Sequence, residues 1–257
     1  MPEHMDQPGL AHPPGRTALV TGAGRGIGKA TALALAVQGL HVVLTGRHEQ
    51  RLHEAVGEIR ALGGSAQALV GDLADEGFWQ ALAALDRSVD VMVHNASQPA
   101  PFGVIENVPI ADLHGVMDSV LFAGLRLARL CVPHMKQAGF GRLVFVGSTA
   151  SELGAHGQVA YAAAKSGLQG LVRSLALEVS RFGVTCNLVE PGFIDTERTR
   201  GAVSDTVRAA LGARAAVGRA GTPEEVAAVI AFLSSPLASY VTGVCLPVSG
   251  GIELGLK

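Results

Sequence analysis

Apolar residues gather in short continuous runs along the chain, and most runs are followed by a longer segment with helical periodicity. The runs predict strands at 17–20, 41–45, 66–70, 89–94, 142–146, 184–189 and 244–248. The segments between them predict helices at 29–38, 49–62, 75–85, 110–137, 160–182 and 223–233, the fourth with a stop or bend near Pro133. Because a strand exposed on one face alternates apolar and polar residues, continuous runs indicate strands that helices cover on both faces.

This order of elements predicts the fold class. Strands that alternate with helices, without a break in composition, favour one α/β domain built on a doubly wound parallel sheet of about seven strands. We expect this single domain to span 16–257. The residues before it, 1–15, contain acids, four prolines and no long apolar run, and they predict a disordered leader.

The composition excludes several classes of protein. The 257 residues carry a net charge of −2, which favours neither a nucleic-acid partner nor an acidic membrane. The chain lacks a run of about 18 apolar residues, so the sequence predicts no membrane-spanning helix. Three cysteines without metal-ligand spacing predict neither a disulfide framework nor a metal site, and they favour a reducing cytoplasm.

A glycine-rich turn follows the first predicted strand and precedes a helix. It reads Thr-Gly-Ala-Gly-Arg-Gly-Ile-Gly at 21–28. Gly22, Gly26 and Gly28 can supply a tight turn, a close backbone approach to a pyrophosphate and tight packing of the helix, whose amino end attracts phosphate. A plain turn is the alternative, but the strand before and the helix after favour a dinucleotide site that includes Arg25 and Ile27.

The end of the second predicted strand indicates which dinucleotide is bound. An NAD site usually has an acidic residue there to hold the ribose 2′-hydroxyl, and residues 44–47 (Leu-Thr-Gly-Arg) contain none. Arg47 and Arg25 could instead bind the 2′-phosphate of NADP, because guanidinium geometry suits phosphate. The alternative is that both arginines are solvated.

A tyrosine and a lysine stand four residues apart in the fifth predicted helix, at Tyr161 and Lys165. They share one face of the helix, where an ammonium can lower the pKa of a phenol from about 10 and suit it to proton transfer. Ser148 closes the fifth strand, at the sheet edge where such folds bind ligands. The alternatives are a surface pair and a helix cap.

These motifs together resemble the short-chain dehydrogenase/reductase family over residues 16 to the end, and most of all its 3-oxoacyl-acyl-carrier-protein reductases and related ketoreductases. The similar pieces are TGAGRGIG, Asp72-Leu73, Asn95-Ala96, Ser148, YAAAK at 161–165, Pro191-Gly192, and the tail at 241–251. The resemblance implies a Rossmann-like fold and an oxidoreductase.

The resemblance also implies a role for each matching residue. Tyr161 would be the general acid and base, Lys165 would lower its pKa and hold the nicotinamide ribose, and Ser148 would polarise the substrate carbonyl. Cofactor contacts would further include Asp72 and Leu73 at the adenine, Asn95 and Ala96 along the cleft, and Pro191, Gly192, Ile194 and Thr196 near the nicotinamide. Residues at about 195–216 would form a substrate lid.

The chain departs from the family pattern at several positions. The segment after the fourth strand reads His94-Asn-Ala-Ser97, and the long helix has Val120 where the family has an asparagine that links the lysine to solvent. Water, His94 or Ser119 are then the possible proton routes. The two arginines that grip the acyl carrier are replaced by residues 139 (Gly) and 182 (Phe), with Lys136, Arg173 and Arg181 nearby.

The resemblance implies reduction of a ketone to a secondary alcohol with NADPH. A 3-oxoacyl thioester, which could be held on acyl carrier protein, is the preferred substrate. A free or cyclic ketone or alcohol is the first alternative, and a non-catalytic NADP(H)-binding protein is the second. Because members of the family usually form tetramers, the resemblance also implies a homotetramer formed through helices 110–137 and 160–182.

Overall fold

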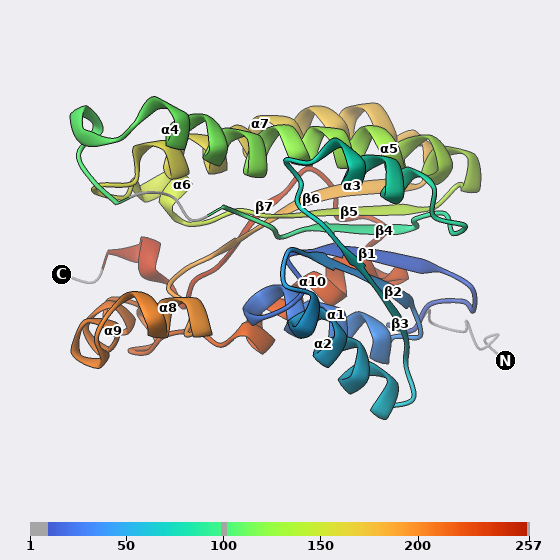
Figure 1. Ribbon diagram of the computed structural model, residues 1–257, viewed down its shortest axis with the longest axis horizontal. Coiled ribbons are helices and arrows are strands. Elements are labelled where there is room, and N and C mark those ends of the chain that lie inside the picture. The colour runs from blue at the N-terminus through green and yellow to red at the C-terminus, as the bar shows by residue number, and fades with distance from the viewer. Residues whose placement is uncertain (1–9, 99–101, 256–257) are drawn as a thin grey trace, which may run out of the picture.

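Seven parallel strands form one sheet in the computed structural model, which describes residues 10–98 and 102–255 (Figure 1). The strands are β1 (Thr17–Thr21), β2 (His41–Gly46), β3 (Ser65–Val70), β4 (Val91–His94), β5 (Gly141–Val146), β6 (Val184–Pro191) and β7 (Cys245–Val248). Their order is β3-β2-β1-β4-β5-β6-β7, so the direction of winding reverses between β1 and β4. The doubly wound parallel sheet predicted from the sequence is confirmed.

Helices cover both faces of this sheet, as predicted. On one face lie α1 (Gly26–Val37), α2 (Glu49–Ala61) and α10 (Pro223–Ser234); on the other lie α3 (Glu76–Ala83), α4 (Ile110–Met117), α5 (Ala123–Ala138) and α7 (Val159–Val179) (Figure 1). Each layer has its own apolar core, with Leu35 and Ile230 in one and Leu127 and Leu168 in the other. None of the helices described is long and apolar enough to cross a membrane.

The shorter elements lie in the connections. They are α6 (Ala150–Leu153), α8 (Glu197–Ala202), α9 (Asp205–Gly212), and the short helical turns η1 (Ile105–Asn107), η2 (Asp118–Phe122), η3 (Ser180–Phe182), η4 (Pro236–Ala238) and η5 (Ile252–Leu254). Helices α8 and α9 occupy the segment predicted to be a lid. The side chains of Thr196 and Ser204 accept hydrogen bonds from the backbone and cap these two helices at their amino ends.

The long helix predicted at 110–137 is interrupted at a different place from the one expected. It does not stop at Pro133, which lies inside α5. The buried side chains of Cys131 and Met135 hold the residues around this proline against the core. The interruption is instead η2, one π-helical turn between α4 and α5 that contains Val120.

The predicted leader at 1–15 is described only from residue 10, and residues 1–9 lie outside the described part. His12 is buried, its backbone N–H donates to the carbonyl of Gln38 at 2.9 Å, and its ring packs edge-on against Phe140. Ordered packing therefore begins before residue 16, where we had expected the domain to start. The aromatic contact is long-range, and the composition of the segment does not reveal it.

Candidate active site

A cleft of about 460 Å³ opens at the carboxyl ends of the strands, where the connections after the neighbouring strands β1 and β4 lead to opposite faces of the sheet. Its walls include nearly all the residues predicted to bind cofactor or substrate, namely Gly22, Arg25, Gly26, Ile27, Arg47, Asp72, Leu73, Asn95, Ala96, Ser148, Tyr161, Lys165, Pro191, Gly192, Ile194 and Thr196. The predicted residue that does not line it is Gly28, which packs beneath the glycine turn against the carbonyl of Gly22. The structure therefore brings both ends of the predicted site together.

The glycine turn has the shape that a pyrophosphate requires. Gly22 and Gly26 have φ angles of +65° and +53°, which residues with a Cβ rarely adopt. A Cβ at Gly22 would lie 3.0 Å from Cα of Ala96, and one at Gly28 would collide with the Gly22 carbonyl. The side chain of Arg25 forms no capping bond at the start of α1, so the first backbone N–H groups of this helix are available to an anion.

His94 ties the end of β4 to the glycine turn and to η2. The hydroxyl oxygen of Thr21 accepts the backbone N–H groups of Asn95 and Ala96 at 3.1 and 3.0 Å, so its own proton points to His94 Nδ1, 3.1 Å away. His94 Nε2 then donates to the carbonyl of Val120 at 2.9 Å. Burial, and after it the charge of Lys165, lowers the pKa of His94 to about 4, so the ring is neutral.

These bonds bear on how protons reach Lys165 in a chain that has Val120 where the family has an asparagine. Its side chain is fully buried in the apolar core, and its carbonyl is held by His94. The two nitrogens of His94 are hydrogen-bonded to Thr21 and to Val120, and neither bond leads directly to Lys165. Ser119 donates to the Val116 carbonyl and accepts from the backbone N–H of Gln98. Neither neighbour supplies an open path to Lys165.

We expect His94→Asn to change how the free energy of unfolding depends on pH, because His94 is buried in its neutral form and donates to the Val120 carbonyl. The unfolded parent chain takes up the His94 proton near pH 6.5 and the folded chain only near pH 4, so the parent loses stability between those values as the pH falls. At pH 8 the variant should be about 1–3 kcal/mol less stable, because the Val120 carbonyl loses its donor. That gap should shrink towards pH 4.5 in denaturant unfolding. His156→Asn, at an exposed histidine, serves as the control. A difference in stability between the parent and His94→Asn that stays the same at every pH would contradict the role given to His94.

Ser148, Tyr161 and Lys165 meet inside the cleft. Ser148 follows the end of β5, and the other two side chains lie one turn apart on the same face of α7. The Ser148 hydroxyl is close enough to the phenol of Tyr161 to lower its pKa. Lys165 Nζ donates to the carbonyl of Val146 at 2.6 Å and lies 5.6 Å from the centroid of the Tyr161 ring.

The electrostatics of this group differ from the role implied by the resemblance. Burial raises the pKa of Tyr161, and the Ser148 hydrogen bond and the charge of Arg198 only partly oppose this effect. Burial, and after it the charge of Arg198, lowers the pKa of Lys165 to about 7. The charge of Arg198 favours the Tyr161 phenolate. A phenol that stays protonated at neutral pH is a ready acid for a developing alkoxide.

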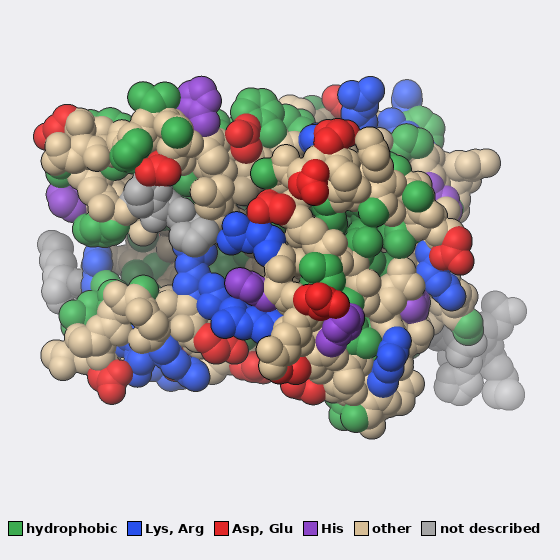
Figure 2. Space-filling view, in the orientation of Figure 1, with side chains coloured by type: hydrophobic (Ala, Val, Ile, Leu, Met, Phe, Trp, Pro, Cys, Tyr) green, Lys and Arg blue, Asp and Glu red, His purple; other side chains and the backbone are tan. Residues whose placement is uncertain are grey.

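The far end of the cleft is rich in arginine. Arg47 lies 3.4 Å from the carboxylate of Asp72, both half exposed, and Arg25 is close enough to Arg51 for their charges to repel. Figure 2 shows Lys and Arg side chains gathered around the hollow in the middle of this face. Sequence reasoning missed Arg51 and Arg198. Arg51 stands four residues after Arg47 on α2, a spacing that could have indicated it.

Comparison with known proteins places this site in a family. A family model described as enoyl-(acyl carrier protein) reductase matches residues 22–253. The 3-oxoacyl-(acyl-carrier-protein) reductase FabG of Escherichia coli (strain K12) is 37% identical over 244 residues, which cover 93% of this chain and 98% of that protein. The chain belongs to the short-chain dehydrogenase/reductase family. It is an oxidoreductase acting on CH–OH or C=O groups.

Solved structures of this family agree closely in fold. A protein of Agrobacterium tumefaciens provisionally named a gluconate dehydrogenase has a TM-score of 0.91 and 32% identity, covering 97% of this chain and 100% of that one. A 3-oxoacyl (acyl-carrier-protein) reductase from A. tumefaciens C58, solved with NADP bound, has a TM-score of 0.86 and 33% identity, covering 93% and 94%. The predicted membership of the family is confirmed.

Proposed function

We propose that this protein reduces a 3-oxoacyl thioester to the 3-hydroxyacyl thioester with NADPH. The observation that carries the proposal is the meeting of Ser148, Tyr161 and Lys165 in one cleft with a glycine turn shaped for a dinucleotide. The names of the E. coli and A. tumefaciens relatives specify a 3-oxoacyl substrate and support this choice.

The residues present fit NADP(H). The glycine turn and the start of α1 would hold the pyrophosphate, and Arg25, Arg47 and Arg51 surround the place where a 2′-phosphate would lie. Asp72 and Leu73 would flank the adenine. Asn95 and Ala96 would line the middle of the cleft, and the loop that includes Pro191, Gly192, Ile194 and Thr196 would contact the nicotinamide. When bound, the cofactor supplies the hydride that reduces the ketone carbon.

The side chains of this chain orient the ketone and handle its proton. The Ser148 hydroxyl donates a hydrogen bond to the ketone oxygen and keeps it beside the phenol. Tyr161 Oη gives its proton to that oxygen as negative charge develops there. Lys165, with a pKa of about 7 and its Nζ 5.6 Å from the centroid of the Tyr161 ring, is the neighbouring group from which the phenolate can regain a proton near neutral pH. Burial of these groups strengthens each of these interactions.

Cofactor choice should depend on Arg47. We expect Arg47→Asp to weaken NADPH binding by about 1.5–3 kcal/mol, the value of a charge-assisted hydrogen bond, and to improve NADH relative to NADPH. The new carboxylate would repel the 2′-phosphate and accept from the ribose 2′-hydroxyl. The measurement is the dissociation constant of each nucleotide by fluorescence titration. Arg87→Asp, exposed and outside the cleft, is the matched control; unchanged NADPH binding in Arg47→Asp would place the 2′-phosphate elsewhere.

The reaction is tested by loss of NADPH absorbance with three matched probes. These are the N-acetylcysteamine thioesters of 3-oxohexanoic acid and 2-hexenoic acid, and cyclohexanone as a cyclic ketone. We expect the 3-oxoacyl thioester to be reduced best. Preference for the enoyl thioester would favour the reaction named in the description of the family model. Absence of turnover with every probe, together with tight NADPH binding, would favour a non-catalytic binding protein.

A carrier-bound substrate, a cytoplasmic location and a homotetramer stay predictions. Of the three cations that could replace the carrier-binding arginines, Lys136 and Arg181 lie together, each 4.9 Å from the Phe182 ring, whereas Arg173 contacts Cys245. This cluster follows the carboxyl ends of α5 and α7, at the edge of the sheet opposite the cleft. The cluster and the cleft therefore lie at opposite edges of the sheet. On α5, Leu127 belongs to the core, whereas Leu125 and Leu130 are exposed and are available to a second copy.

A further inference from the structure

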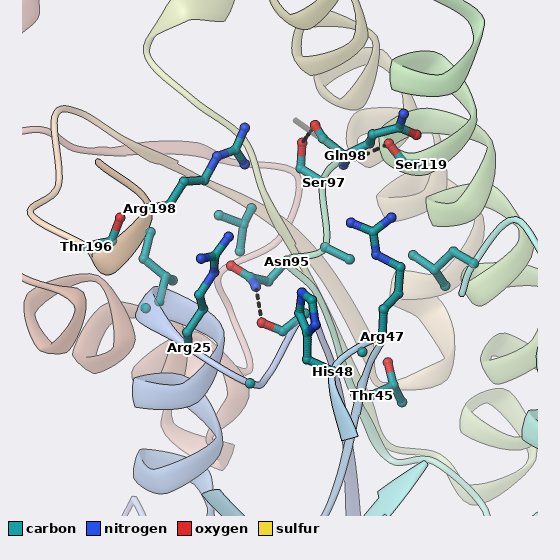
Figure 3. Close-up of a pocket in the computed structure, with 18 of the residues that line it drawn as sticks. Arg25, Thr45, Arg47, His48, Asn95, Ser97, Gln98, Ser119, Thr196 and Arg198 are labelled. Carbon is teal, nitrogen blue, oxygen red and sulfur yellow. Dashed lines mark hydrogen bonds between the residues drawn. The ribbon is translucent and has the colours of Figure 1, made fainter. Parts of the chain in front are cut away.

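Arg198 is a cation in the lid that the cofactor contacts do not explain. It is the second residue of α8, it lines the cleft, and its side chain is exposed in the absence of ligand. Figure 3 shows Arg198 and Arg25 projecting into the cleft from two different elements, the lid and the glycine turn. The two guanidinium groups are close enough for the charge of Arg198 to lower the pKa of Arg25.

Three other arginines of the lid and of the segment after it are paired with carboxylates. Arg200 binds Asp195 through two hydrogen bonds, Arg208 contacts Asp195 and Asp205, and Arg219 binds Glu225. Within residues 10–98 and 102–255, Arg198 forms no ion pair and no side-chain hydrogen bond. Its charge is therefore available to a ligand in the cleft.

The charge of Arg198 changes the pKa values of the groups proposed to transfer protons. It lowers the pKa of both the partly buried Tyr161 and the buried Lys165. The positive charges of Arg198 and Lys165 repel each other across the cleft. An anion bound between them would relieve this repulsion. The electrostatics thus favour a negative group of the ligand close to the reacting carbonyl.

The anionic groups of NADP(H) have other partners in the cleft. The glycine turn and α1 fit the pyrophosphate, while Arg47 and Arg51 stand near the 2′-phosphate position. Arg198 stands in the lid between the glycine turn, against which Thr196 and Glu197 pack, and the groups Tyr161 and Lys165, whose pKa values its charge lowers. A substrate held at Tyr161 can therefore bring an anionic group of its own to Arg198.

We propose that Arg198 binds a carboxylate of the substrate, so that the preferred ketone is a 3-oxoacyl compound whose acyl chain ends in a free carboxylate. This inference rests on the proposed function, because it names the substrate class of the same site. A guanidinium binds a carboxylate through two parallel hydrogen bonds, which adds orientation to attraction. The lid would then fold over an acidic chain while Ser148 and Tyr161 hold the ketone oxygen.

Two thioesters that differ in one group test the proposal. The N-acetylcysteamine thioesters of 3-oxohexanoic acid and 3-oxoadipic acid have the same chain, with a terminal methyl in one and a carboxylate in the other. We expect the parent protein to prefer the 3-oxoadipoyl thioester in kcat/KM. Arg198→Met should lower kcat/KM for that thioester by about 10- to 100-fold, as loss of a charge-assisted hydrogen bond would, mainly through KM. The 3-oxohexanoyl thioester should lose less, because it loses only the effect of the Arg198 charge on Tyr161 and Lys165, so the ratio of the two kcat/KM values should fall.

Two further variants separate charge from structure. Arg198→Lys keeps the charge and should retain part of the preference, since it loses only the two-pronged geometry. Arg200→Met lies on the same helix and outside the cleft, and it loses an exposed ion pair with Asp195. We expect Arg200→Met to leave the preference between the two thioesters unchanged.

A binding measurement keeps the inference distinct from the proposed function. Calorimetric titration of the NADP⁺-loaded protein with the 3-oxoadipoyl thioester reports binding without turnover. Tight binding that Arg198→Met abolishes supports the inference even where no thioester is reduced, a result that would refute only the proposed function. Equal use of both thioesters by the parent would overturn the inference. So would weaker NADPH binding and an equal loss for both thioesters in Arg198→Met, since Arg198 would then hold the cofactor.

Discussion

Tyr161→Phe should lower ketone turnover by about 10²- to 10⁴-fold, the range that general acid catalysis contributes. The substitution removes the phenolic proton and keeps the ring, which packs beside Lys165 and the core of α7. NADPH binding should remain, because the glycine turn and the arginines are untouched. The measurements are kcat for the 3-oxohexanoyl thioester and the dissociation constant of NADPH.

The chain provides its own control for this substitution. Its second tyrosine, Tyr240, is fully exposed and lies outside the cleft. Tyr240→Phe makes the same chemical change and should leave kcat and the melting temperature unaltered. A Tyr161→Phe protein with near-parental turnover would refute the mechanism, since no other phenol of this chain lines the cleft.

The parts of the fold that sequence patterns predicted are those set by local physics. Continuous apolar runs such as 17–20 become strands buried on both faces, because helices pack on each side. The glycines at 22 and 26 adopt positive φ angles that only the absence of a Cβ makes easy. Tyr161 and Lys165 share a face because a helix has 3.6 residues per turn.

The parts that could not be predicted depend on contacts between distant residues. Pro133 suggested a helix end, yet α5 continues through it because Cys131 and Met135 are buried against the core. The real interruption at η2 has no proline or glycine within it, and its Val120 carbonyl is held by His94 from β4, 26 residues earlier. A pattern read along the chain contains no record of that bond.

The charges of the site illustrate the same distinction. The spacing of Tyr161 and Lys165 correctly indicates proximity, but the sequence does not reveal how deeply both are buried. Burial reverses the expected direction of the Tyr161 pKa and leaves Lys165 near pH 7. Arg198 lies in a segment predicted only as a lid, and its effect on both groups depends on how α8 lies over the cleft.

Lys165→Met should remove activity and also stabilise the protein without nucleotide at neutral pH. The unfolded chain holds the Lys165 proton up to about pH 10.5, whereas the folded chain releases it near pH 7. Folding therefore costs free energy at pH 7 and below, and this cost disappears as the pH rises towards 10.5. Methionine has a similar shape and no charge to bury. Turnover should fall about 10²-fold or more, because Tyr161 loses its neighbouring proton donor.

The gain in stability is measured as the free energy of unfolding in urea at pH 7 and pH 10. At pH 7 we expect Lys165→Met to be more stable by about 1–3 kcal/mol, the relief of burial less the loss of the hydrogen bond to the Val146 carbonyl. At pH 10 the difference in stability between Lys165→Met and the parent should be much smaller. Lys165 is then neutral in the folded parent, and pH 10 is close to the pKa of about 10.5 at which the unfolded chain also loses this proton. Lys136→Met, which removes a lysine outside the cleft beside the Phe182 ring, should produce no such pH-dependent difference. A variant less stable than its parent at both pH values, by the same amount, would mean that Lys165 keeps its full charge when buried. The proton donor assigned to it here would then have a pKa too high to serve Tyr161 at neutral pH.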